Sequence, residues 1–128
     1  MSEASNSKRI LLVDDEPNII IPIEFLMQQQ GYQVDMAYNG KDALTKMEAH
    51  TPDVVILDVM MPEMDGFEVA RQIRNNSKYE NTSIVFLTAK GTDQDKMSGY
   101  DSGGEIYLTK PFENDELVQT VKELIQFG

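Results

Sequence analysis

The chain contains no cysteine and is poor in positive charge. Without cysteine it can form no disulfide, no thiolate metal site and no cysteine nucleophile. Eleven Lys and Arg residues stand against 22 Asp and Glu residues, which gives a net charge of −11. The phosphates of nucleic acids and of anionic membranes repel such a surface. We therefore expect neither nucleic acid nor membrane among its direct partners.

Long hydrophobic runs are also missing. The first apolar run, residues 10–13, is too short for a signal-peptide core or a membrane span, so we expect a cytoplasmic location. The length of 128 residues fits one domain, and 41% hydrophobic residues suffice for a packed core. We expect a disordered or flexible segment over residues 1–7 and a single domain over residues 8–128.

Two kinds of segment alternate along the chain. Short apolar segments rich in β-formers cover residues 10–13, 34–37, 54–57, 84–87 and 106–108. Stripes with helical spacing follow four of them, over residues 19–27, 43–47, 67–73 and 117–125. Thr92 and Asp95 have the spacing of a capping pair and predict the start of a weak helix over residues 93–102. Most of the strands are apolar at every position, which suits burial on both faces of a parallel sheet. The alternation predicts an α/β fold with a five-stranded parallel sheet and five helices.

Polar residues follow four of the five predicted strands. Asp14 and Asp15 follow the first strand, Asp58 the third, Thr88 the fourth, and Thr109 and Lys110 the fifth. The second strand contributes none, which is expected of an edge strand. In parallel α/β folds, ligands bind at the carboxyl ends of the strands, so we expect these side chains to converge.

The chemistry of this group favours phosphoryl transfer. Carboxylates without His or Cys suit Mg²⁺, or Mn²⁺, rather than Zn²⁺. An aspartate such as Asp58 can act as a nucleophile and form an aspartyl phosphate. Lys110 and Thr88 offer a positive charge and a hydroxyl donor to the oxygens of a transferring phosphoryl group.

Each residue alone also has a plainer structural interpretation. Asp14 and Asp15 can cap the helix that begins near Pro17. Asp58 can be a turn residue, and Lys110 can belong to an ordinary loop. Their joint placement at the ends of four strands is what favours a functional site.

Four ordered motifs resemble the receiver domain of bacterial response regulators, the CheY-like family of two-component systems. They are LVDDEP at residues 12–17, DVVILDVMMPEMDG at 53–66, FLTA at 86–89 and YLTKPF at 107–112. The resemblance extends from Lys8 to about Phe127. It implies the flavodoxin-like (βα)5 receiver fold.

The resemblance also implies a role for each acid. Asp58 matches the phosphoacceptor, and Mg²⁺ would be held by Asp15, Asp58 and the backbone carbonyl of Met60. Asp14 would act mostly through a metal-bound water. Met60 and Lys90 match the positions that flank the phosphoryl group and tune its lifetime.

The remaining matches concern the switch. Lys110 would contact the phosphoryl group, and Thr88 would move toward it. Tyr107 matches the aromatic residue that swings inward when the threonine moves. The peptide bond before Pro111 is cis in the family.

The resemblance implies a protein that signals through protein contacts. A sensor histidine kinase or a histidine phosphotransfer protein would donate the phosphoryl group, and an unknown protein would be the downstream target. The domain would assist its own phosphorylation and dephosphorylation without turning over a separate substrate, so it is not expected to be an enzyme. We expect a stand-alone monomer or weak dimer; the alternative is a receiver domain of a longer regulator.

Two other functions remain to be compared. A metal-dependent phosphohydrolase with an aspartate nucleophile commonly carries a second acid two residues later, where this chain has Met60, which transfers no proton. A pseudo-receiver that binds partners without phosphorylation would not need Asp58, Thr88 and Lys110 together.

Two segments depart from the usual family pattern. Gly103-Gly104-Glu105-Ile106 stands where the family usually has Gly-Ala-Asp and a second acid. The additional glycine should loosen this loop, and Ile106 removes an acid from the paired dimer face of winged-helix regulators. Pro22 falls within the first helical stripe and should kink that helix.

Overall fold

A computed structural model describes residues 8–127 of the chain. The strands are β1 (Arg9–Val13), β2 (Gln33–Ala37), β3 (Val54–Leu57), β4 (Ser83–Thr88) and β5 (Ile106–Thr109). The helices are α2 (Pro17–Gln29), α3 (Gly40–Ala49), α4 (Gly66–Arg74), α5 (Asp93–Ser102) and α6 (Asn114–Phe127), with a short 3₁₀ helix η1 (Ser77–Tyr79). The flexible segment expected over residues 1–7 lies outside the described residues.

The strands form one sheet in the order β2-β1-β3-β4-β5, and every neighbouring pair is parallel. β2 is an edge strand, as its lack of polar end residues suggested. The predicted fold class, a five-stranded parallel sheet with five helices, is confirmed. The strand order changes direction between β1 and β3, so the carboxyl ends of these two strands flank the switch point.

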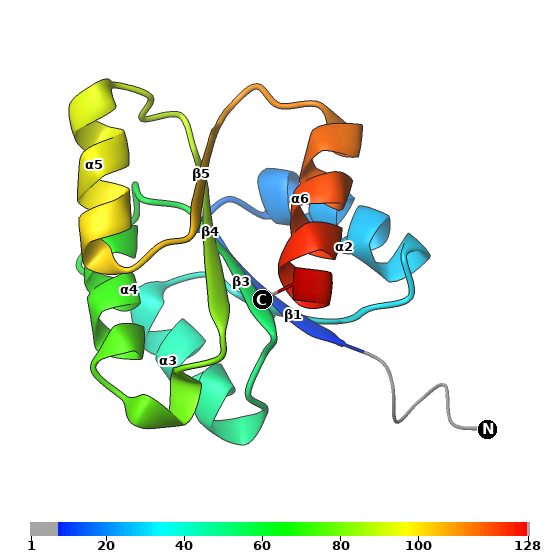
Figure 1. Ribbon diagram of the computed structural model, residues 1–128, viewed down its shortest axis with the longest axis horizontal. Coiled ribbons are helices and arrows are strands. Elements are labelled where there is room, and N and C mark those ends of the chain that lie inside the picture. The colour runs from blue at the N-terminus through cyan, green and yellow to red at the C-terminus, as the bar shows by residue number, and fades with distance from the viewer. Residues whose placement is uncertain (1–7, 128) are drawn as a thin grey trace.

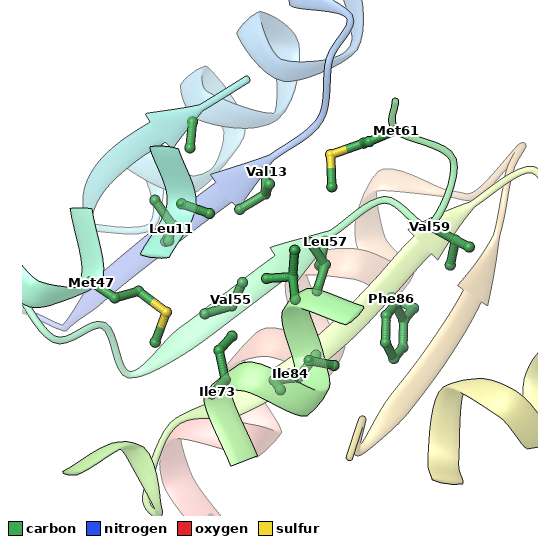
Figure 2. Close-up of a cluster of buried hydrophobic side chains, with 14 of the residues drawn as sticks. Leu11, Val13, Met47, Val55, Leu57, Val59, Met61, Ile73, Ile84 and Phe86 are labelled. Carbon is green, nitrogen blue, oxygen red and sulfur yellow. The ribbon is translucent and has the colours of Figure 1, made fainter. Parts of the chain in front are cut away.

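Successive residues of the strands pack into two separate cores. Leu11, Val55 and Phe86 belong to the core beneath α3 and α4. Their neighbours Leu12 and Ile56 point to the other face, where α2 and α6 cover them. Figure 1 shows these helices on the two sides of the sheet, with α5 on the side of α3 and α4. Figure 2 shows the first core, in which the strand side chains meet the side chains of the covering helices.

Polar caps start three of the helices. The side chains of Asn39 and Asp65 accept hydrogen bonds from backbone N–H groups in the first turns of α3 and α4. At α5, Thr92 and Asp95 form a reciprocal capping box. This box is the main sequence signal for α5, because the helix has little apolar periodicity.

Two glycines shape the loop before β5. Gly103 ends α5 with a φ of 117°, and the Gly104 N–H donates to the Gly99 carbonyl at 3.0 Å. A Cβ atom on Gly104 would lie 2.5 Å from Cε2 of Phe86. Gly104 therefore permits a close approach of the backbone to the core, and the expected loosening of the loop stays a prediction.

The first helix contains two prolines. α2 runs from Pro17 and continues through Pro22 to Gln29. Pro17 stands at the start of the helix, where a missing N–H is harmless. Pro22 lies inside α2 and removes one backbone donor, so the helix lacks one of its internal hydrogen bonds. The kink expected at Pro22 stays a prediction.

Candidate functional site

The strand ends hold the candidate residues in register. The Asp58 N–H donates to the Val13 carbonyl at 2.9 Å, which continues the β1–β3 pairing one residue past β3. Toward the β5 edge of the sheet, the Lys110 N–H donates to the Thr88 carbonyl at 2.8 Å. Backbone hydrogen bonds thus fix the positions of Asp58 and Lys110 before any side-chain contact is considered.

Two of the three aspartates are buried. Asp14 is 5% exposed and Asp58 is 6% exposed, whereas Asp15 is exposed. The Asp14 carboxylate accepts a hydrogen bond from the Glu16 N–H at 3.0 Å, and Asp58 accepts a longer one from the Met60 N–H at 3.4 Å. Buried carboxylates need compensating partners.

Lys110 provides that partner for Asp14. Its Nζ lies 3.1 Å from Oδ2 of Asp14, and both side chains are mostly buried. Burial raises the pKa of Asp14, and the negative charge of Asp58 adds to this effect, while the Glu16 N–H and Lys110 oppose it. Among the described residues the ion pair of Lys110 is with Asp14. The expected contact of Lys110 with a phosphoryl group on Asp58 stays a prediction.

A cleft of about 400 Å³ opens at this edge of the sheet. Its lining residues are Asp15, Glu16, Ile19, Asp58, Met60, Ala89 and Lys110. Asp58 is therefore buried within the fold but reachable from the cleft. The exposed Met60 side chain stands at the rim.

The acids at the end of β1 have a composition that suits a hard divalent cation. One carboxylate oxygen each from Asp14, Asp15 and Glu16 lie within 4.8 Å of one another. Oxygen ligands of this kind fit Mg²⁺ or Mn²⁺. The sequence reasoning missed Glu16; its place next to two aspartates was the available signal. Asp58 is not in this group among residues 8–127, but it shares the cleft with Asp15 and Glu16.

The capping interpretation of the aspartates does not account for their positions. The residue that precedes the first turn of α2 is Glu16, and within the described residues its side chain makes no capping hydrogen bond. Asp14 and Asp15 lie further from the helix, and Asp14 bonds the N–H of Glu16, which precedes the helix. The two aspartates are thus not the cap of α2.

Thr88, Lys90 and Tyr107 form a second group beside the cleft. Thr88 is fully buried, and its hydroxyl oxygen accepts a hydrogen bond from the Lys90 N–H at 3.4 Å. The Tyr107 hydroxyl donates to the Lys90 carbonyl at 2.7 Å. Tyr107 is thus already in an inward position. Burial, and to a lesser degree the charges of Asp95 and Asp58, raise the pKa of Tyr107 to about 12.

Two further predicted residues border this region. The Lys90 side chain lies 3.9 Å from Asp95 of α5, so it is drawn toward that helix. The peptide bond between Lys110 and Pro111 is cis.

Together these residues provide what phosphoryl transfer to a carboxylate requires. Asp58 offers a nucleophilic oxygen at the cleft, and the acids beside it suit a metal ion. Lys110 can pair with a phosphoryl oxygen, and the Thr88 hydroxyl, which is an acceptor here, keeps its own proton for donation.

Comparison with known proteins agrees with this arrangement. The family model of the response regulator receiver domain matches residues 10–122. This chain belongs to the response regulator receiver domain family. It is thus a receiver domain of the two-component response regulators, a class of signalling modules that receive phosphoryl groups from histidine kinases.

Individual relatives of this receiver domain are similar along most of its length. Transcriptional regulatory protein TrcR of Mycobacterium tuberculosis is 38% identical over 118 residues, which are 92% of this chain and 45% of the relative. Response regulator Rre1 of Synechocystis is 37% identical over 91% of this chain and 51% of its own. The receiver domain spans about half the length of these curated relatives.

Solved structures show the same fold. The structure of the Vibrio cholerae chemotaxis protein CheY4 superposes with a TM-score of 0.87 at 35% identity, over 92% of this chain and 98% of that one. The receiver domain of the Francisella response regulator 1452 gives a TM-score of 0.86 at 32% identity, over 94% and 98% of the two chains. In the part of this receiver domain that the structure describes, no helix has the length and apolar character needed to cross a membrane.

Proposed function

We propose that this receiver domain is a phosphorylation switch whose phosphoacceptor is Asp58. The observation that carries the proposal is the position of Asp58, which is 6% exposed yet lines the open cleft together with Asp15 and Lys110. Burial limits access by bulk water, whereas the cleft leaves room for an incoming phosphoryl group.

The reaction is a transfer between two covalent phosphoryl carriers. A carboxylate oxygen of Asp58 attacks the phosphorus of a phosphohistidine on the donor, an O–P bond forms, and the N–P bond to the imidazole breaks. The donor histidine leaves with the electron pair and takes up a proton. The product is an aspartyl phosphate on this chain.

Acids in the cleft would hold the divalent ion that the family uses. We propose Asp15, Asp58 and the Met60 carbonyl as its direct ligands, with Asp14 acting through water and Glu16 adding negative charge nearby. When bound, Mg²⁺ (or Mn²⁺) neutralises charge on the phosphoryl oxygens. Without it, the carboxylates repel one another. Burial raises the pKa of Asp14, and the charge of Asp58 adds to this effect.

Lys110 and Thr88 respond to the new group in this proposal. A phosphoryl group adds strong acceptor oxygens and a charge of about −1.5 to −2. Lys110 leaves Asp14 to pair with it, and Thr88 turns its hydroxyl toward it. The space that Thr88 vacates stabilises the inward position of Tyr107, and the face formed by α5, β5 and α6 changes its preferred conformation. Met60 and Lys90 flank the phosphoryl group and set its lifetime.

The partners follow from this chemistry. A sensor histidine kinase or a histidine phosphotransfer protein supplies the phosphoryl group, and a protein target binds the altered face. We propose a single receiver domain over residues 8–128, acting in the cytoplasm as a monomer or weak dimer without contact to nucleic acid. It assists its own phosphorylation without turning over a separate substrate. The stand-alone arrangement is part of this proposal; the longer relatives represent the alternative, a receiver domain joined to further segments.

Phosphorylation can be tested with acetyl phosphate and intact-mass measurement. Wild-type protein with Mg²⁺ should gain the mass of one phosphoryl group, and chelation of the metal should abolish the gain. Asp58→Asn should remain unmodified, whereas Asp101→Asn, which changes an exposed acid of α5, should label like wild type. Persistent labelling of Asp58→Asn would assign the acceptor elsewhere.

A turnover assay distinguishes a receiver switch from a phosphohydrolase. A receiver consumes about one equivalent of acetyl phosphate quickly and then turns over only through its own dephosphorylation. Sustained hydrolysis of an aryl phosphate, far beyond one equivalent and abolished in Asp58→Asn, would identify a phosphohydrolase and contradict the proposal.

A further inference from the structure

Tyr107 occupies a confined position under α5. Its side chain is 6% exposed, its hydroxyl is fixed on the Lys90 carbonyl, and its ring centroid lies 5.7 Å from that of Phe86. Phe86 in turn packs edge-on against Phe67 of α4 at 5.4 Å. Figure 2 shows Phe86 within the core on this side of the sheet.

The ring fits only because α5 carries no side chain at its point of contact. A Cβ atom on Gly99 would lie 2.6 Å from Cδ2 and 2.9 Å from Cε2 of Tyr107. Favourable carbon–carbon contacts lie at about 3.5–4.0 Å, so a methyl group and the present ring position exclude each other.

Gly99 lies in the interior of a helix, where glycine is among the least favourable residues. α5 thus carries a residue that weakens it, at a position that faces Tyr107. If a methyl group at position 99 clashed with the Tyr107 ring, the ring would move more easily than α5. A ring can rotate about χ1 into another rotamer, whereas α5 is fixed by its capping box and by the hydrogen bond from Gly104 to Gly99.

We propose that Gly99 is a positioning residue for Tyr107, which admits the ring to its inward position and thereby sets how readily the switch responds. The contacts form one connected path: Gly99 faces the Tyr107 ring, the Tyr107 hydroxyl bonds Lys90, and the Lys90 N–H bonds Thr88. The role of Gly99 in the switch rests on the function proposed above, whereas its effect on the position of the Tyr107 ring does not.

The test compares Gly99→Ala with Gln94→Ala, which introduces the same residue at an exposed position of α5. In NMR spectra of the full chain without any phosphoryl analogue, wild type and Gln94→Ala should show cross-peaks between the rings of Tyr107 and Phe86. Gly99→Ala should lose them, because its methyl group displaces the Tyr107 ring. Cross-peaks of wild-type intensity in Gly99→Ala would overturn the proposal.

A second measurement addresses the switch. If the inward ring favours the activated state, beryllofluoride with Mg²⁺ should bind Gly99→Ala roughly fivefold or more weakly than wild type, within the usual range of coupling between linked sites. Equal affinities would overturn the coupling. If wild type itself bound no beryllofluoride, the proposed function would fail, while the NMR comparison would still decide the role of Gly99.

A double variant separates positioning from general packing. Gly99→Ala combined with Tyr107→Leu removes the ring that the methyl group meets. If Gly99→Ala fails to fold but the double variant folds, the clash lies with Tyr107, as proposed. Failure of both variants to fold would assign Gly99 to the packing of α5 as a whole and would overturn the proposal.

Discussion

At the scale of single residues, Glu63 adopts a backbone conformation that suits glycine better. It lies in the loop between Asp58 and α4 with a φ of 69°. This left-handed conformation costs a non-glycine residue about 1 kcal/mol or somewhat more. Contacts within the loop stabilise this conformation of Glu63. One of them is the hydrogen bond that the Met64 N–H donates to the Pro62 carbonyl at 2.8 Å.

Glu63→Gly should therefore raise the free energy of unfolding by a few tenths to about 1 kcal/mol, since relief of strain exceeds the greater entropy of glycine in the unfolded chain. Urea denaturation measures the difference. The matched control is Glu80→Gly, because Glu80 has an ordinary φ of −62° and should be destabilised by the same change. Equal destabilisation of both variants would contradict the strain at Glu63.

The Lys110–Asp14 ion pair is the second residue-scale feature with a measurable consequence. Lys110→Met leaves the buried Asp14 carboxylate without its cation and beside Asp58. It should lower the free energy of unfolding in metal-free buffer by about 1.5–3 kcal/mol. Lys122→Met, on the exposed side of α6, should change it by no more than about 0.5 kcal/mol.

A double variant tests the cause of that loss. Adding Asp14→Asn to Lys110→Met removes the unpaired charge, so the double variant should recover most of the stability that Lys110→Met loses. Simple addition of the two separate effects would show that Lys110 stabilises the fold through something other than Asp14.

At the scale of elements, one pair of side chains joins the ends of several segments. Arg74, the last residue of α4, bonds both carboxylate oxygens of Glu105 at 2.9 Å and the Gly103 carbonyl at 2.9 Å. Glu105 also accepts the Ile84 N–H at 2.7 Å. The acid that replaces the usual aspartate before β5 thus connects α4, β4 and the end of α5.

Glu105→Ala removes the acceptor for Arg74 and for the Ile84 N–H, so it should lower the free energy of unfolding by about 1–3 kcal/mol. Glu48→Ala, at an exposed position of α3, should stay within about 0.5 kcal/mol of wild type. Chemical denaturation of both variants gives the comparison. A loss at Glu105 no larger than that at Glu48 would show that the connection adds nothing to stability.

At the scale of the whole molecule, repulsion among acidic residues should weaken the fold. The net charge of −11 makes the protein sensitive to screening, and the acids of the cleft concentrate that charge. Sodium chloride should therefore raise the melting temperature. Mg²⁺ at the same ionic strength should raise it further, because it binds only the folded chain.

Free Mg²⁺ at ten times its dissociation constant should add about 1.4 kcal/mol to the free energy of unfolding. For a domain of this size, that raises the melting temperature by roughly 4 °C. Calorimetry with and without chelator measures the increment. Asp15→Asn should keep the response to sodium chloride and lose most of the additional response to Mg²⁺. If Mg²⁺ raised the melting temperature of Asp15→Asn as much as that of wild type, the metal site would lie outside the cleft.

The sequence predicted the layers of this molecule better than the contacts within its site. Apolar runs such as residues 54–57 identify buried strands because a parallel sheet excludes polar side chains from both faces. The same reasoning placed Asp58 and Lys110 at strand ends. No local pattern encodes the pairing of Lys110 with Asp14, because the two residues are far apart in the chain and meet only in the folded sheet.

Two further features could not be predicted from the sequence. η1 is only three residues long, too short for a periodic pattern. Gly104 gave a signal for loop flexibility in sequence, but the nearby Phe86 ring, 18 positions earlier in the chain, determines its role. Such contacts come from the way the chain returns on itself.

The sheet keeps its two cores apart, with alternate residues of each strand committed to one side. Substitutions beneath α2 and α6 can therefore accumulate during evolution, or be introduced by design, without repacking the layer that holds Phe86 and Tyr107. Related domains can therefore acquire a new protein contact on one face of the sheet while the packing on the other face stays the same.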